Sequence, residues 1–505
     1  MKRNIEALTE ETFDLCVLGG GITGAGVALD AATRGWRVAL IDKGDFASGT
    51  SAASSKLVHG GLRYLEYGHF SLVYEALIER GRLLRNAPHL VRPLPFVLPF
   101  YRGQRLRPWQ WRFGLTLYDL LAGSENIARS RGLTIGRLRS SHPSLRSDGL
   151  VGGAIYQDAL MDDARVCIAV LQTAARHGAV LANYVEAVDF EKHGGAITGV
   201  FAKDCLTGHS LTIRSRAVLN AAGPWADALC RLAGDDDGPH LQPTKGVHLI
   251  APALGHREAF LLLHPRDGRV FFVIPWLGKT LIGTTDTAFD AQPDSMRVES
   301  AEIDYLLEGY NHHFDPNLQG ERLMGAFAGL RPLLRSRPNE PSARSREFRL
   351  HASPSGLVTA LGGKFTTFRA MAETIVDFLG TRLGKKGRCR TQSLPLDGSP
   401  REPWSDFYSH QLTSLQQQYP IAADSAAHLL HRYGAGVDVV LAMIRQTPRG
   451  FERVHPDEPD LVGEAAFAIA EEMAVSSDDV YLRRRRIGMW RPDVFRRADV
   501  SRAHY

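Results

Sequence analysis

The 505-residue sequence predicts an α/β fold with three parts: a parallel βαβ unit, an antiparallel sheet and an all-helical C-terminal part. Three observations predict these parts. A glycine-rich turn follows an apolar, β-type run at residues 13–18, three strand-like runs lie between residues 246 and 285, and five helical patterns follow residue 404. A length near 500 residues agrees with about three domains, since one domain has about 150 residues.

Composition and charge exclude several classes of protein. Apolar residues make up 44% and charged residues 23% of the chain, which is ordinary for a folded soluble protein and excludes a disordered one. The formal charge is +5, but residues 481–505 contain eight Arg and two Asp, so the first 480 residues sum to −1. The main part of the chain therefore has no net positive charge that would attract a polyanionic ligand. The excess positive charge belongs to a short C-terminal tail.

Cysteine usage and hydropathy predict a cytoplasmic protein. The five cysteines are widely separated and form no C-x-x-C pair, so we predict buried thiols in a reducing compartment and no metal site. The N-terminal residues lack the apolar segment of a secretory signal. The longest uncharged apolar run, residues 15–29, contains five glycines and is shorter than the roughly 20 residues that a membrane-spanning helix needs. We expect a soluble protein or one bound peripherally at the membrane.

The glycine-rich turn has the pattern of a dinucleotide-binding unit. Gly19, Gly21 and Gly24 satisfy G-x-G-x-x-G directly after the first strand, and a helix and a second strand follow, closed by Asp42. Glycines allow backbone amides to approach a pyrophosphate, the helix N-terminus favours its negative charge, and the carboxylate can accept hydrogen bonds from both ribose hydroxyls. We therefore predict a Rossmann-type dinucleotide site.

The segment after Asp42 favours FAD over NAD. Residues 42–68 are rich in Gly, Ser, Thr and Ala, and loops of this length inside a compact domain are uncommon unless they are functional. Such a segment can wrap a second large part of a cofactor, whereas a nicotinamide enzyme would more often continue directly into another helix.

Two sequence blocks resemble a known family. Residues 54–68, SSKLVHGGLRYLEYG, and residues 362–373, GGKFTTFRAMAE, together with the glycine motif, resemble the FAD-dependent, respiratory glycerol-3-phosphate dehydrogenases. The resemblance continues at residues 156–166, 218–227, 245–250, 271–276 and 328–334. The sequence IGTTD at residues 282–286 is less specific, because it also occurs in related amine and amino-acid oxidases.

This resemblance implies a domain organisation. An FAD-binding Rossmann-type domain is assembled from discontinuous segments, and it is accompanied by an antiparallel-sheet substrate domain and an all-helical C-terminal domain. The predicted boundaries are 1–84, 151–224 and 328–385 for the FAD-binding domain, 85–150 and 225–327 for the substrate domain, 386–404 for a linker, and 405–505 for the helical domain.

The resemblance also implies a reaction. The family oxidises sn-glycerol 3-phosphate to dihydroxyacetone phosphate by hydride transfer from C2 to FAD N5 and passes the electrons to membrane quinone. An oxidase that uses O₂ is an alternative within the same fold. A flavin-containing nucleic-acid-binding protein is an alternative from another class, disfavoured by the body charge of −1. The oligomeric state is left open, with a homodimer as one expectation.

Oxidising an alcohol next to a phosphate needs cations for the phosphate and a base for the hydroxyl proton. Arginine binds two phosphate oxygens with its planar fork, and histidine has a pKa suited to accepting a proton near neutrality. By the resemblance, the substrate-binding candidates are Arg63, Tyr64, Arg331, Arg346 and Lys364. The catalytic candidates are His59, His248 and Lys364. The sequence does not assign the base, and Lys364 could instead stabilise the developing alkoxide. The cofactor-binding candidates are Gly19, Gly21, Ile22, Thr23, Gly24, Asp42, Thr50, Ser51, Ser55, Lys56, Leu57, Gly223, Gly363, Lys364, Phe365 and Thr366.

The basic tail has two interpretations. The eight arginines of residues 481–505 could bind an anionic membrane surface near the quinone pool. Four of them, Arg483, Arg484, Arg485 and Arg486, lie on a predicted helix over residues 478–490. Alternatively, they form a solvated helix face that pairs with the nearby acidic residues Glu471, Glu472, Asp478 and Asp479.

Overall fold

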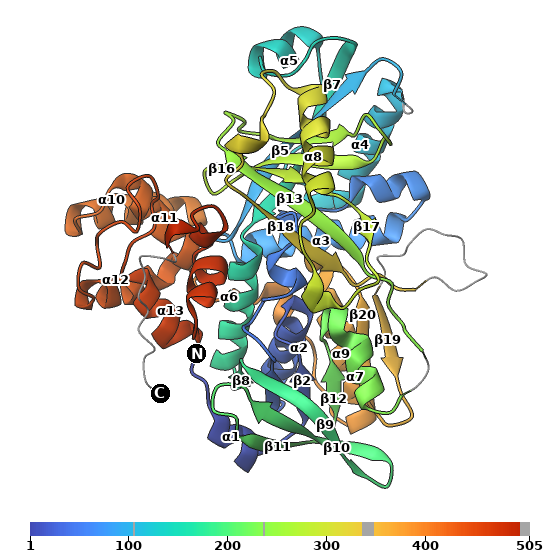
Figure 1. The fold of residues 1–505 in the computed structure, drawn as a ribbon, viewed down its shortest axis with the longest axis vertical. Helices are drawn as coiled ribbons and strands as arrows, with labels where there is room; N and C mark the ends of the chain where they lie inside the picture. The colour runs from blue at the N-terminus through green and yellow to red at the C-terminus, as the bar shows by residue number, and fades with distance from the viewer. Residues whose placement is uncertain (105–106, 236–237, 336–347, 495–505) are drawn as a thin grey trace.

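The computed structural model describes residues 1–104, 107–235, 238–335 and 348–494 (Figure 1). A six-stranded sheet forms the centre of the dinucleotide-binding part, in the order β19-β20-β12-β2-β3-β8. Neighbouring strands are parallel except for β19 and β20. The strands are β2 (Leu15–Leu18), β3 (Val38–Ile41), β8 (Val180–Ala182), β12 (Val218–Asn220), β19 (Phe348–Ala352) and β20 (Val358–Gly362). Because they come from widely separated segments, the prediction that the dinucleotide-binding domain is discontinuous is confirmed.

Three helices pack beside this sheet: α2 (Ile22–Thr33), α6 (Asp163–Arg176) and α9 (Phe368–Leu383). Helix α2 packs against both of the others (Figure 1). A Cβ at Gly26 would lie 2.7 Å from the ring of Phe368, so glycine at this position permits the close approach of α2 and α9. The strands β2 and β3 are buried along their whole length, as expected for strands covered on both faces.

A second, ten-stranded sheet forms the substrate-side layer. Its main path is β17-β13-β16-β15-β14-β5-β7-β4, with β18 paired to β13 and β6 paired to β7, and most pairs are antiparallel. The strands are β4 (Leu57–Val58), β5 (Val91–Tyr101), β6 (Arg131–Leu133), β7 (Leu150–Met161), β13 (Thr244–Pro252), β14 (Ala259–Leu263), β15 (Val270–Trp276), β16 (Lys279–Gly283), β17 (Thr287–Ala288) and β18 (Gly325–Arg331). The three predicted strand-like runs correspond to β13, β15 and β16.

The remaining elements surround these sheets. A small sheet in the order β1-β11-β10-β9 adjoins the dinucleotide-binding part. Its strands are β1 (Thr12–Phe13), β9 (Val185–His193), β10 (Ala196–Asp204) and β11 (Ser210–Ser215). The other helices of the body are α1 (Ile5–Glu10), α3 (Phe70–Asn86), α4 (Pro108–Ala122), α5 (Ile135–Ser141), α7 (Ala226–Leu232) and α8 (Ser300–His313), with a 3₁₀ helix, η2, at Leu62–Tyr67.

The C-terminal part is helical, as predicted. It contains α10 (Trp404–Gln418), α11 (Ala423–Tyr433), α12 (Val437–Gln446) and α13 (Glu464–Glu472), and it lies beside α6 (Figure 1). The predicted continuous helix over residues 478–490 is wrong. A π-helical turn at Asp479–Arg484 is followed by Arg486 in the left-handed region, with φ +68°, and then by a 3₁₀ turn at Ile487–Met489. A left-handed residue cannot continue a right-handed helix.

The arginines at the end of this domain are buried, so both interpretations of the basic run are wrong in placing these side chains at the surface. Arg484, Arg485 and Arg486 are at most 1% exposed. Arg484 donates to Asp45 at 2.7 and 2.8 Å, while Arg483 pairs with Asp45 and also with Asp479, one of the predicted acidic partners. The run therefore joins the helical domain to the dinucleotide-binding part. Arg496, Arg497 and Arg502 lie outside the described residues.

Across the described ranges, no helix has both the length and the apolar character that crossing a bilayer requires.

Candidate functional site

A cavity of about 720 Å³ opens at the carboxyl ends of β2 and β3, where ligands usually bind in parallel α/β sheets. Its wall combines the glycine turn, the loop after β3, the end of β18 and the segment after β20. Of the predicted site residues, the following line it: Gly19, Gly21, Ile22, Thr23, Asp42, Thr50, Ser51, Ser55, Leu57, His59, Tyr64, Gly223, His248, Arg331, Gly363, Lys364, Phe365 and Thr366.

The glycine turn brings backbone amides to the cavity. Gly19 has φ +114°, and a Cβ there would lie 2.6 Å from the Ala221 carbonyl oxygen, so a larger residue would push the turn apart. Gly21 is the N-cap of α2 and supplies no capping side chain. The positive end of α2 thus faces a site suited to an anion. A Cβ at Gly24 would lie 1.9 Å from the Gly19 carbonyl oxygen, so Gly24 supports the packing of the turn and does not line the cavity.

Asp42 accepts hydrogen bonds from backbone amides of the glycine turn and of the loop after β3. Its Oδ2 accepts from the Gly20 amide at 2.7 Å, and its Oδ1 accepts from the Gly44 amide at 2.9 Å. Burial raises the pKa of this carboxyl to about 6, although both amides oppose the shift. Because the carboxylate lines the cavity next to the glycine turn, it stands where a ribose would follow a pyrophosphate.

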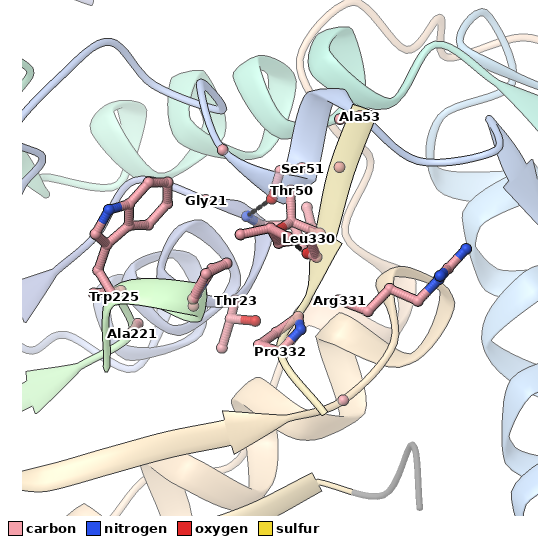
Figure 2. A pocket seen from close by; sticks show the side chains of 18 of the residues that line it. Gly21, Thr23, Thr50, Ser51, Ala53, Ala221, Trp225, Leu330, Arg331 and Pro332 are labelled. Atoms are coloured by element: carbon pink, nitrogen blue, oxygen red, sulfur yellow. Dashed lines mark hydrogen bonds between the residues drawn. The ribbon is translucent and has the colours of Figure 1, made fainter. Parts of the chain in front are cut away.

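Hydroxyl side chains tie the loop after β3 to its neighbours. Ser51 Oγ accepts from the Ile22 amide at 2.9 Å, and Thr50 Oγ1 donates to the Leu330 carbonyl at 2.6 Å, as Figure 2 shows. The loop is therefore connected both to the start of α2 and to β18. This explains why small hydroxyl residues are dense in it.

One histidine is held rigidly at the cavity wall. His248 Nε2 lies 2.8 Å from Ser55 Oγ, and its ring stacks on Phe327 with centroids 5.0 Å apart and an interplanar angle of 9°. Burial, followed by the charge of Lys56, lowers the pKa of His248 to about 3, so its imidazole is neutral at pH 7. His59 also lines the cavity, and its amide donates to Thr366 Oγ1 at 3.3 Å.

Two cations reach the same cavity, Arg331 from the end of β18 and Lys364 from the segment after β20. Arg331 pairs with Asp286 at 3.1 Å and donates to Thr284 Oγ1 at 2.8 Å, which fixes its guanidinium. Lys364 Nζ lies 3.8 Å from the centroid of the Tyr64 ring. In Figure 2 the Arg331 side chain points away from Gly21, so the cavity has a glycine-turn end and an arginine end.

Besides Gly24, two predicted site residues within the described ranges do not line the cavity. Lys56 was predicted to contact the cofactor, but its ammonium lies in the protein interior, 2.8 Å from Asp163 and 2.7 Å from the Ala52 carbonyl. Arg63 is exposed, with its guanidinium carbon 5.9 Å from the centre of the Tyr67 ring. The sequence blocks identified the right segments, but they could not tell which side chains turn inward. Arg346 lies outside the described residues.

Sequence reasoning missed part of the wall at the glycine-turn end. Trp225 lines the cavity, its indole donates to Asp294 at 3.2 Å, and Lys43 Nζ lies 4.7 Å from its ring centroid. The block at residues 218–227 contains this tryptophan, and a large aromatic residue two positions after Gly223 was the available signal.

The helical domain brings together three possible metal ligands. His428, Asp460 and Glu464 have ligand atoms within 4.8 Å of one another. Arg432 Nη1 lies 3.0 Å from each of the two carboxylates, and Arg485 lies 3.5 Å from Asp460 and 3.9 Å from Glu464. Two guanidinium groups therefore already balance the two carboxylates.

The described cavity fits FAD. It joins the N-terminus of α2, whose N-cap Gly21 has no side chain, to a carboxylate after β3 and to the wall formed by the segment after β20. The pyrophosphate, the ribose and the ring system would therefore each have a matching surface. In this arrangement Gly21 and Thr23 would hold the pyrophosphate and Asp42 the ribose.

Comparison with known proteins agrees with this fit. The family described as "FAD dependent oxidoreductase" matches residues 14–378, and the one described as "C-terminal domain of alpha-glycerophosphate oxidase" matches residues 389–499. Among solved structures, the glycerol-3-phosphate dehydrogenase from Bacillus halodurans complexed with FAD aligns with a TM-score of 0.82 at 32% identity. The alignment covers 98% of this chain and 90% of the Bacillus halodurans chain.

Curated relatives match along nearly the whole chain. The aerobic glycerol-3-phosphate dehydrogenase of Bacillus subtilis (strain 168) is 36% identical over 496 residues, which is 95% of this chain and 88% of that protein. The mitochondrial glycerol-3-phosphate dehydrogenase of Homo sapiens is 37% identical over 498 residues, which is 94% of this chain and 67% of that protein. The chain therefore belongs to the FAD-dependent glycerol-3-phosphate dehydrogenase family.

Proposed function

We propose that the protein oxidises sn-glycerol 3-phosphate to dihydroxyacetone phosphate and passes the electrons to a membrane quinone. The observation that carries the proposal is the composition of the cavity. His248, Arg331 and Lys364 line the same cavity as the dinucleotide turn, in a chain similar to glycerol-3-phosphate dehydrogenases over 95% of its length. A neutral base and two cations are what the oxidation of a phosphorylated alcohol requires.

The cations bind the phosphate in this proposal. Arg331 offers a fixed guanidinium and Lys364 a point charge, and Tyr64, beside Lys364, donates a hydrogen bond to the phosphate or the hydroxyl. The ion pair of Arg331 with Asp286 keeps the guanidinium in place before substrate arrives, which lowers the entropic cost of binding. FAD, when bound, supplies the acceptor for the hydride from C2.

His248 accepts the hydroxyl proton in this proposal. Ser55 engages Nε2, and among the described residues none forms a hydrogen bond with Nδ1. A phosphate dianion in the cavity favours the charged imidazolium, so substrate binding makes His248 a stronger base than it is in the free protein. His59 remains the second candidate base.

We place membrane contact on a different surface from the predicted basic run. Helix α4 exposes Trp109, Phe113 and Leu120 along one face, at 64%, 68% and 72% exposure. The adjoining η2 and α3 expose Tyr67, Phe70 and Tyr74 by about half. Large exposed apolar side chains in one region mark an interaction surface, and aromatic rings suit the headgroup level of a bilayer.

The charges around this surface favour an anionic lipid headgroup layer as its partner. Exposed arginines flank the aromatic side chains in the sequence: Arg102, Arg107, Arg112, Arg129 and Arg131. Each basic residue near an anionic membrane contributes about 1 kcal/mol of binding free energy. We therefore propose that the protein binds peripherally at the cytoplasmic face of the membrane through η2, α3 and α4, next to the quinone pool.

One experiment tests the substrate and the acceptor together. The purified flavoprotein is made anaerobic and mixed with glycerol 3-phosphate, and the flavin absorbance is followed. We expect bleaching with glycerol 3-phosphate and not with glycerol. The reduced enzyme is then mixed with a short-chain quinone or with O₂. Rapid reoxidation by the quinone supports the dehydrogenase, whereas equally rapid reoxidation by O₂ with release of hydrogen peroxide would replace it by the oxidase.

A further inference from the structure

A buried cluster of charges joins the cofactor-side loop to the helical domain. Lys56 Nζ lies 2.8 Å from Asp163 Oδ2, and Arg486 Nη2 lies 2.5 Å from Asp163 Oδ1. Both cations also donate to the Ala52 carbonyl, at 2.7 Å from Lys56 and 3.0 Å from Arg486. All three charged side chains are at most 1% exposed. A second carboxylate balances the second cation, because Asp162 Oδ1 lies 3.3 Å from Arg486 Nε. Burial on this scale is costly unless each charge is paired, so the cluster strongly constrains the segments that it joins.

Asp163 also fixes the backbone of residues 54–56. It accepts from the Ser54 amide at 3.0 Å and from Ser54 Oγ at 2.7 Å, and the same Oγ accepts from the Lys56 amide at 3.0 Å. Lys56 has φ +62°, a conformation that non-glycine residues adopt only when their surroundings compensate the strain. The network of Asp163 supplies this compensation, and it thereby fixes the direction of the residue in between, Ser55.

Two contacts connect this network to the proposed base. Ser55 Oγ is 2.8 Å from His248 Nε2. The ammonium of Lys56 lies 4.8 Å from the centroid of the Phe327 ring, and that ring stacks on His248. A change in the position of residues 54–56 would therefore move both the hydrogen-bond partner and the stacking partner of the imidazole.

We propose that Arg486, Asp163 and Lys56 are positioning residues for His248, so that the helical domain takes part in alcohol oxidation by fixing the orientation of its base. The inference rests on the proposed function of His248. It assigns to Lys56 a role other than cofactor contact, and to the C-terminal arginine a role other than membrane binding.

Arg486 is the residue to vary, because replacing Asp163 would leave the buried Lys56 without its carboxylate partner and could prevent folding. Arg486→Met removes one contact to the loop and leaves the ion pair of Lys56 with Asp163. Arg485→Met is the matched control. Arg485 is equally buried, but its guanidinium donates to the Leu461 carbonyl and lies near Asp460 and Glu464, all within the helical domain. Arg486→Lys retains the charge and should recover part of the effect.

Two measurements on the flavin-loaded enzymes decide the proposal. In anaerobic stopped flow, the limiting rate of flavin reduction should fall about 10- to 100-fold in Arg486→Met, because a misplaced reacting group costs rate, while the substrate dissociation constant stays within about twofold. In hydrogen–deuterium exchange, the backbone amides of residues 52–58 should exchange faster in Arg486→Met than in the wild type. In Arg485→Met their exchange should equal that of the wild type.

The outcomes separate this inference from the proposed function. A limiting rate within twofold of the wild type in Arg486→Met, or an equal fall in Arg485→Met, would overturn the positioning role. Unchanged exchange of residues 52–58 would overturn it as well. If glycerol 3-phosphate fails to bleach the wild-type flavin, the proposed function fails, whereas the exchange experiment still decides whether Arg486 fixes the loop.

Discussion

Ser55 and His248 are 193 positions apart in the sequence, yet Ser55 Oγ lies 2.8 Å from His248 Nε2. The serine belongs to the loop that follows the dinucleotide unit, and the histidine belongs to β13 of the substrate-side sheet. Their contact joins the two layers at the cavity, so the proposed base is oriented by the same loop that would surround the cofactor.

Replacing His248 tests its assignment as the base. We expect His248→Gln to slow flavin reduction by glycerol 3-phosphate about 10²- to 10⁴-fold while the flavin content stays unchanged, because general-base catalysis contributes on this scale. Stopped flow under anaerobic conditions measures the rate. The same substitution at His59 is the comparison, and a larger loss there would transfer the role to His59.

Arg331 should act on substrate binding. In Arg331→Met the cavity loses a charge-assisted contact to the phosphate, worth about 1.5–3 kcal/mol, so KM should rise about 10- to 100-fold. Steady-state kinetics with a quinone acceptor measure KM. Arg266→Met is the control, since Arg266 is an exposed arginine that pairs with Glu308 in the same layer. An unchanged KM in Arg331→Met would remove Arg331 from the phosphate site.

Buried histidines should make the fold sensitive to acid. Burial lowers the pKa of His89 and His248 to about 3, and that of His256, His313 and His431 to about 4. Each stays neutral in the folded protein while the unfolded chain takes up a proton below about pH 6.5. The free energy of unfolding should therefore fall as the pH drops from about 6.5 toward 4, by up to about 1.4 kcal/mol per pH unit for each histidine.

His89→Gln isolates one part of this acid sensitivity. His89 does not line the large cavity, so the variant should keep its flavin. Denaturation series at pH 7.5 and pH 5 should show a smaller loss of stability for the variant than for the wild type. His410→Gln, at an exposed position, should leave the pH dependence unchanged. Equal pH dependence in the wild type and His89→Gln would contradict the burial argument.

The apolar face of α4 should control membrane binding. Phe113→Ser and Trp109→Ser should each weaken sedimentation with vesicles that contain anionic lipid by about tenfold or more, because burying such a side chain contributes about 1.5–3 kcal/mol. Phe201→Ser is the matched control, since Phe201 is 40% exposed on β10, remote in the chain from α4. If all three variants bind as the wild type does, α4 is not the membrane surface.

The ion pair between Arg484 and Asp45 should be a strong contributor to domain docking. Arg484→Met leaves a buried carboxylate with fewer partners and should lower the free energy of unfolding by about 3–5 kcal/mol. Chemical denaturation measures this loss. Adding Asp45→Asn to Arg484→Met should restore part of the stability by removing the buried charge, and a purely additive double variant would show that the two groups are not coupled.

Much of the dinucleotide unit could be predicted from sequence, because its signals are local. Gly19, Gly21 and Asp42 are set by the order strand, turn, helix, strand, and each of these elements has a short-range pattern. The same holds for the helices α10 to α13, but not for the predicted helix over residues 478–490. Local patterns do not show which side chains of an irregular loop turn inward, and this is why Lys56 and Arg63 were placed in the site although neither lines the cavity.

By itself, then, the sequence determined the βαβ unit, the helical C-terminal part and the segments that surround the cavity, because backbone preference and apolar periodicity act over a few residues. Only the tertiary structure decided whether the arginines at residues 483–486 are exposed to solvent or lie in the interior. Their partners Asp45 and Asp163 lie more than 300 positions away in the chain. A run of charges is ordinarily solvated, and it becomes interior only when distant segments bring enough opposite charge to offset the loss of water.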